Sequence, residues 1–83
     1  STYNFLEAKL KVIKIQKMLY DAIVLTPWPD KLKNQLLKNI TRNINREVDK
    51  LISDIEKEKS VTRNILEPAK SIFIGNLREM RMQ

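Results

Sequence analysis

Apolar residues recur every three or four positions along most of this chain, and the pattern is clearest between residues 30 and 59. In that segment, successive apolar positions are separated by 3, 4, 4, 3 and 4 residues: Leu37, Ile40, Ile44, Val48, Leu51 and Ile55. Because an α-helix has 3.6 residues per turn, this spacing places the apolar side chains on one side of a helix. We predict an amphipathic helix over about residues 30–59.

The segment from about residue 3 to residue 25 carries a wider apolar stripe at the same spacing. Its members are Phe5, Leu6, Leu10, Val12, Ile13, Ile15, Leu19, Tyr20, Ile23 and Val24. Residues 9–16 alternate briefly as a strand would, but the alternation breaks at Val12–Ile13 and does not resume. We therefore predict a helix over about 3–25, and a stripe this wide suits a helix that packs against two neighbours.

A third apolar segment follows the first two, from about residue 61 to residue 82. Two adjoining rows at helical spacing run through it, namely Val61, Ile65, Ala69, Ile72 and Asn76 beside Leu66, Phe73, Leu77 and Met80. Pro68 either kinks this helix or lies in the first turn of a helix that begins near Glu67. Residues 72–74 could form a strand, but three residues without a partner strand favour the helix.

Two breaks separate these segments and set the expected architecture. Pro27 and Pro29 cannot lie inside a continuous helix, and a softer break falls around residues 59–62. We predict an all-α fold, an antiparallel three-helix bundle of a single domain over residues 1–83. The alternative is a dimeric hairpin of the first two helices, with the third packed across it. Since the chain begins with Ser1, we expect it to be a fragment of a larger protein.

The composition excludes several classes of function. The 83 residues include no cysteine, no histidine and a single glycine. Thiolate and imidazole metal sites, Ser–His and Cys–His nucleophiles and glycine-rich phosphate loops are therefore excluded. The Ser, Lys, Tyr and carboxylate side chains that remain show no activating partner. We expect no catalytic residues, no metal and no cofactor.

The net charge of +6 is concentrated in the first half of the chain. Residues 1–46 contain nine Lys or Arg and three Asp or Glu, whereas residues 47–83 contain seven of each sign. Six basic residues recur at helical spacing along the first two helices: Lys11, Lys14, Lys17, Lys38, Arg42 and Arg46. If both rows face the same way, they form one basic face for an acidic or phosphorylated peptide or a nucleic-acid backbone. The alternative is a solvated surface that only keeps the domain soluble.

Apolar residues also outnumber what a small bundle can bury. Around Gly75 they occupy every side of the predicted third helix, so one edge of that helix is a candidate partner surface. The residues that we assign to an apolar partner surface are Trp28, Ile72, Phe73, Ile74, Leu77 and Met80. Trp28 lies between two prolines and either caps the core or anchors a partner. Gly75 inside a helix suggests that another helix approaches closely there.

A group of acidic residues lies on the second predicted helix, and its expected role is structural. The group comprises Glu47, Asp49, Asp54, Glu56 and Glu58. No histidine or glycine-containing loop accompanies these carboxylates, as a metal site would require. Lys50, Lys57 and Lys59 lie among them, so we expect exposed pairing along the helix surface.

These features lead to one principal hypothesis and two alternatives. The principal hypothesis is a non-catalytic protein–protein interaction domain, with an apolar helical surface for the partner and the basic face for an acidic segment. The alternatives are a reader of phosphorylated peptide or nucleic-acid backbone, and a self-associating helical module. No apolar run exceeds the four residues 22–25, so we expect no membrane partner. We expect an intracellular protein, in the nucleus rather than the cytoplasm.

Overall fold

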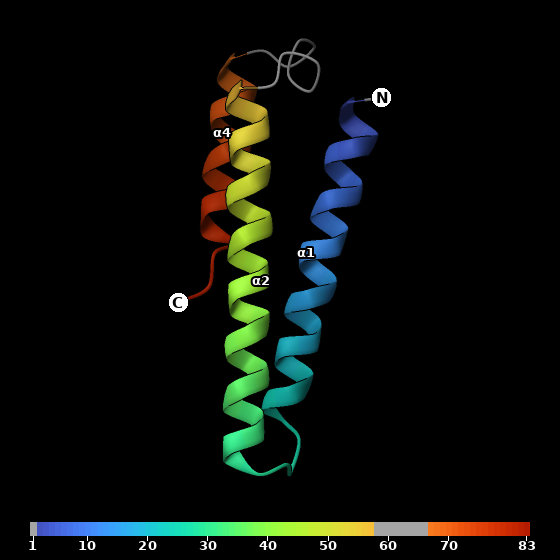
Figure 1. Cartoon of the computed structure of the whole chain (residues 1–83). Helices are drawn as coiled ribbons and strands as arrows, with labels where there is room; N and C mark the ends of the chain where they lie inside the picture. The colour runs from blue at the N-terminus through green and yellow to red at the C-terminus, as the bar shows by residue number, and fades with distance from the viewer. Residues whose placement is uncertain (1, 58–66) are drawn as a thin grey trace.

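The computed structural model of the chain describes residues 2–57 and 67–83. Within those ranges it contains three helices and no strand: α1 (Thr2–Val24), α2 (Asp30–Lys57) and α4 (Glu67–Glu79) (Figure 1). The all-helical fold predicted from the apolar spacing is therefore confirmed. The bounds of α1 and the start of α2 match the predicted segments to within one residue.

The connection between α1 and α2 contains both prolines, as predicted. The Thr26 hydroxyl donates a hydrogen bond to the Ile23 carbonyl (2.8 Å), which closes the end of α1. Pro29 lies directly before α2, and its carbonyl accepts the first helical bond, from the Lys33 amide (3.0 Å). The Lys33 ammonium then donates to the carbonyls of Val24 (2.7 Å) and Thr26 (2.9 Å). The second helix thus supplies hydrogen bonds to the C-terminal end of the first.

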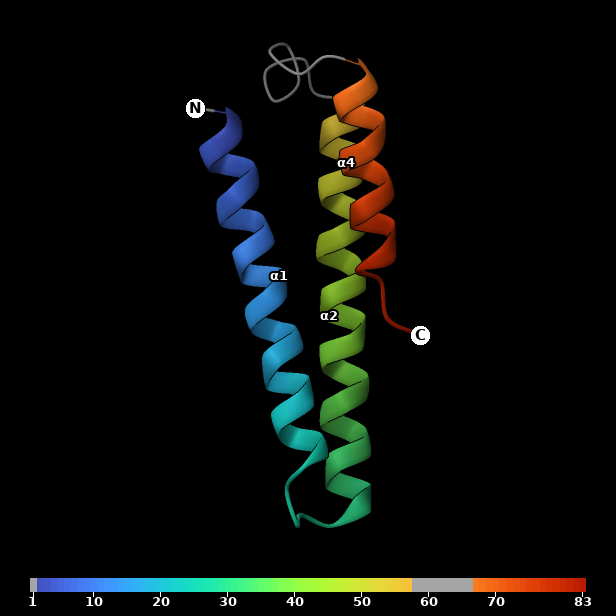
Figure 2. The same cartoon turned by 180° about the vertical axis from the view of Figure 1, so that it is seen from behind.

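The second helix is the central element of the molecule. Figures 1 and 2 show α1 on one side of α2 and α4 on another, with α4 beside only the C-terminal half of α2. Eight buried residues from the three helices form the core: Leu6, Ile13, Ile44, Val48, Leu51, Ile55, Ile74 and Leu77. The fold therefore buries most of its apolar core at one end of the hairpin, where three helices meet, whereas Ile23, next to the connection, is buried outside this cluster.

The third predicted helix, 61–82, can be compared with the structure only from residue 67 onward. Pro68 lies in the first turn of α4, as one of the two sequence interpretations required. The other interpretation, a kink at Pro68, concerns a helix from residue 61, and residues 58–66 lie outside the described part of the chain. At its other end α4 stops at Glu79, three residues before the predicted end. Beyond it, residues 81 and 82 bond to side chains of α2.

Gly75 does not have the role that the sequence suggested. Among the described residues, a Cβ atom placed on it would meet no atom within 4 Å beyond the helix itself. The prediction of a closely approaching helix is therefore wrong, and packing does not explain this glycine.

Candidate interaction surfaces

The six basic residues singled out in the sequence are all exposed. Lys11 forms an ion pair with Glu7 one turn away (3.5 Å). Within residues 2–57 and 67–83, no ion pair involves the other five, namely Lys14, Lys17, Lys38, Arg42 and Arg46. Their charges are therefore available to a ligand.

The two basic rows do not share one face. Lys14, the middle residue of the α1 row, lines a groove between α1 and α4. Arg42, the middle residue of the α2 row, lies about 140° around its helix from the midpoint of Ile44 and Val48, at 100° per residue. Since those two residues face the core, Arg42 points away from α1 and from the groove. The single basic face two helices wide is thus divided into two separate rows.

The apolar residues predicted to form a partner surface are also divided. Ile74 and Leu77 are buried in the core, whereas Ile72 is 66% exposed. Trp28 is 45% exposed in the connection between α1 and α2, at the opposite end of α2 from the start of α4. Phe73 and Met80, with Leu77 beneath them, are the members that the structure brings together.

These three residues form one wall of the groove between α1 and α4. Leu10 and Lys14 of α1 form the other wall, and the groove has a volume of about 300 Å³. Asn76 and Glu79 add polar atoms on the α4 side. The groove is an open surface feature in which an apolar lining is bordered by both signs of charge.

A second apolar surface lies on α1, on the side turned away from the core. It comprises Val12, Ile15, Met18, Leu19 and Ala22, hereafter the outer face of α1, and all five are exposed. Ile15 is 63% and Met18 is 69% exposed. The sequence did signal an unusually wide apolar stripe on this helix, but we expected both of its sides to pack within the bundle.

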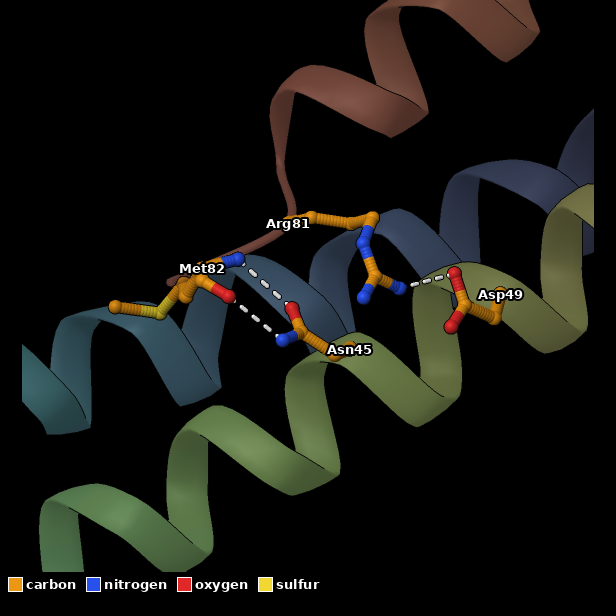
Figure 3. Close-up of polar contacts among 4 residues, drawn as sticks. All are labelled: Asn45, Asp49, Arg81 and Met82. Atoms are coloured by element: carbon orange, nitrogen blue, oxygen red, sulfur yellow. Dashed lines mark hydrogen bonds and ion pairs between the residues drawn. The ribbon is translucent and has the colours of Figure 1, made fainter.

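A third arrangement joins the C-terminal residues to α2 and was not predicted. The side-chain amide of Asn45 donates to the Met82 carbonyl (2.6 Å) and accepts from the Met82 amide (2.7 Å) (Figure 3). Arg81 forms an ion pair with Asp49 one turn further along α2. The sequence placed Arg81 and Met82 in the third predicted helix, so no signal in the spacing identified the contact.

The acidic residues of α2 pair differently from the prediction. Asp49 pairs with Arg81, and Glu56 pairs with Arg78 of α4 (3.6 Å), instead of with the neighbouring lysines. Glu58 and Lys59 lie outside the described residues. Across the described ranges, no group of three or more acidic side chains is arranged to hold a metal ion. Asp49 and Glu56 therefore link α2 to the residues that follow α4 and to α4 itself.

A smaller hollow of about 140 Å³ lies between α1 and α2, and Leu51 is among the residues that line it. Phe5 and Lys9 line it from α1, and the Lys9 ammonium lies 5.7 Å from the centre of the Phe5 ring. Its α2 wall carries both signs of charge, so it favours no particular ligand.

None of the described helices combines the length and the apolar character needed to cross a membrane. No family model matches the chain, and comparisons with curated proteins and with solved structures found no significant match.

Proposed function

We propose that this chain is a non-catalytic protein-interaction domain, an antiparallel three-helix bundle that binds an acidic amphipathic helix on the outer face of α1. The observation that carries the proposal is the apolar outer face itself. Val12, Ile15, Leu19 and Ala22 follow the 3-4-3 spacing of a helix that packs along one side, yet no element of the described fold covers them.

Covering this face with a helix is energetically favourable. Large apolar side chains on it remain about half to two-thirds exposed, from Val12 at 48% to Met18 at 69%. Removing that much apolar surface from water contributes on the order of 1 kcal/mol per side chain. A partner helix that buries four of them gains about 4 kcal/mol from this face, and it must add its own apolar side chains and be already helical, because ordering a flexible peptide costs much of the gain.

The charge beside the face selects an acidic partner. Lys11 and Lys14 lie on the same helix as the outer face, close to Val12 and Ile15 in sequence, and both are exposed. Residues 1–46 carry the whole net charge of +6. A second copy of this chain would bring two basic α1 helices together, so charge repulsion disfavours self-association through this face. Glu or Asp side chains flanking the partner's apolar stripe complement it instead.

Binding of a phosphorylated peptide or a nucleic-acid backbone is the competing function. It has less support because the α1 and α2 basic rows point in different directions, so one extended polyanion does not contact both at once. Such a ligand would bind through charge alone, and its affinity would fall steeply as salt is added.

The test uses a designed helical peptide whose apolar stripe is leucine and whose other positions are mainly glutamate, with a lysine version as its control. We expect the acidic peptide to bind at least tenfold more tightly than the basic one. Replacing Ile15 and Leu19 by Gln should weaken binding at least tenfold. Ile72→Gln, an equally exposed apolar site on α4, is the matched control and should bind as the unmodified chain does.

Three results would contradict the proposal. Equal binding of the acidic peptide by the Ile15→Gln/Leu19→Gln variant would place the partner elsewhere. A dimer in sedimentation at micromolar concentration, lost in the same variant, would make a second copy the occupant. Binding of duplex DNA or a phosphopeptide that this variant leaves unchanged would favour the anion-binding alternative.

A further inference from the structure

The contact between Asn45 and Met82 has the bonding pattern of peptide recognition. One side-chain amide pairs with both the N–H and the C=O of the same residue, at 2.7 and 2.6 Å (Figure 3). A neighbouring β-strand makes this pair of bonds to a residue of an extended chain. An asparagine amide can replace that strand because it contains the same acceptor and donor as a peptide group. Asn45 therefore recognises the backbone at this position, for any residue except proline, which lacks the N–H.

Two further contacts give the site a preference for particular side chains. Arg81, the residue before Met82, pairs with Asp49, which lies one helical turn from Asn45 on α2. The Met82 side chain is partly buried and packs against the core. The occupied site thus holds an arginine followed by an apolar residue, each bound by a separate feature of α2 and the core.

The bound segment lies outside regular structure and is held by few bonds. Residues 81–83 follow the end of α4 and form no helix or strand. Arg81 and Gln83 are exposed, and both partners of the Arg81–Asp49 pair remain accessible to solvent. A segment held by two neutral hydrogen bonds, one exposed ion pair and one apolar side chain can dissociate locally while the helices stay folded.

We propose that Asn45 and Asp49 form a binding site for an extended peptide that carries an arginine followed by an apolar residue. Residues 81 and 82 of this chain are its resident ligand, and a segment of another protein with the same two features takes their place when they dissociate. The site lies on α2 and the C-terminal segment and uses no residue of the outer face of α1. It therefore goes beyond the proposed function, and either proposal can fail without the other.

The experiment titrates the isotopically labelled 83-residue chain with the blocked peptide EMRMQ, which has the sequence of residues 79–83. Binding is followed by the resonances of the Asn45 side-chain amide and of the Asp49 backbone amide. A variant with Arg81→Glu and Met82→Pro frees the site, because it reverses the charge facing Asp49 and removes the N–H that Asn45 accepts. Circular dichroism confirms that the helices of this variant are retained.

We expect saturable binding of the peptide to the freed variant. The peptide concentration at half-saturation should be at least fivefold lower than for the unmodified chain. The unmodified chain needs more peptide because its own tethered residues compete at an effective concentration on the order of millimolar. Peptides EMEMQ and EMRPQ, which lack the arginine or the N–H, should bind at least tenfold more weakly. Adding Asn45→Ala to the freed variant should cause the same loss, whereas adding Asn43→Ala, an exposed asparagine on the same helix, should not.

A charge exchange provides the second measurement. In the chain carrying Asp49→Arg, peptide EMEMQ should bind better than EMRMQ, which reverses the preference of the original site. If the freed variant loses its helices, the same comparison in the unmodified chain at higher peptide concentration replaces it. Absence of saturable binding to both chains, or binding that Asn45→Ala leaves unchanged, would overturn the proposal and leave the contact as a structural cap.

Discussion

The two halves of α2 differ sharply, although one apolar pattern runs through both. The half beside α4, residues 44–57, contains the buried residues Ile44, Val48, Leu51 and Ile55. The other half, residues 30–43, contains none: Leu32 is exposed, and Leu36, Leu37 and Ile40 are only half-buried. In α2, helical spacing thus shows which side chains can point inward, and the buried ones lie where α4 is present; Ile23 of α1 is buried without α4.

The same division explains where the exposed apolar residues of α1 lie. The outer face spans residues 12–22, in the half of α1 nearest the connection to α2, whereas α4 lies beside the other end of the hairpin. Two helices alone form a single layer, which can bury one side of each helix at most. The end of the molecule without α4 therefore retains apolar surface for a partner, and the end with α4 provides most of the stability.

Truncating one leucine in each half of α2 gives the largest expected contrast. Leu51→Ala removes a buried side chain from the three-helix end and should lower the free energy of unfolding by about 3 kcal/mol. Leu37→Ala makes the same chemical change at a half-buried position and should cost about 1 kcal/mol, because solvent already reaches the site. Urea denaturation measures both values. Equal losses would mean that the two ends are equally well packed.

Much of the fold could be predicted from local features. The 3-4 spacing gives the helices, and two prolines within three residues give the connection, since each of these signals acts within a few residues of its cause. Pro68 in the first turn of α4 is also a local signal, because proline is tolerated in a first helical turn. Apolar spacing also showed that α1 has more apolar surface than one neighbour covers.

Features that depend on how the helices are rotated or on distant contacts could not be predicted. The Asn45–Met82 bonds join residues 37 positions apart, and nothing near Met82 indicates that the chain leaves the helix there. Whether Lys14 and Arg42 share a face depends on how each helix turns toward the core. Apolar residues occur on every side of α4 near Ile74, so the sequence does not show which of them faces α2. The burial of Ile74 depends on that orientation.

Lys33 offers a smaller test, at the end of the hairpin that α4 does not cover. Its ammonium donates to the Val24 and Thr26 carbonyls, at the negative end of the α1 dipole. Lys33→Met keeps the apolar stem and removes these bonds, so it should lower the free energy of unfolding by about 1 kcal/mol. Lys31→Met, an exposed neighbour with no such bonds, should change it by less than about 0.5 kcal/mol. Identical urea midpoints for the two variants would show that the cap contributes nothing.

Gly75→Ala is the smallest change and the only stabilising one. Glycine in a helix costs about 0.5–1 kcal/mol relative to alanine, and a Cβ atom here meets nothing within 4 Å, so α4 should gain that amount. If α4 stabilises only the end that it covers, amide hydrogen exchange should slow in α4 and in residues 44–57 of α2 but stay unchanged in residues 30–43. Slower exchange along the whole of α2 would instead mean that the two halves of this helix unfold together. The end without α4 would then depend for its stability on the end that α4 covers.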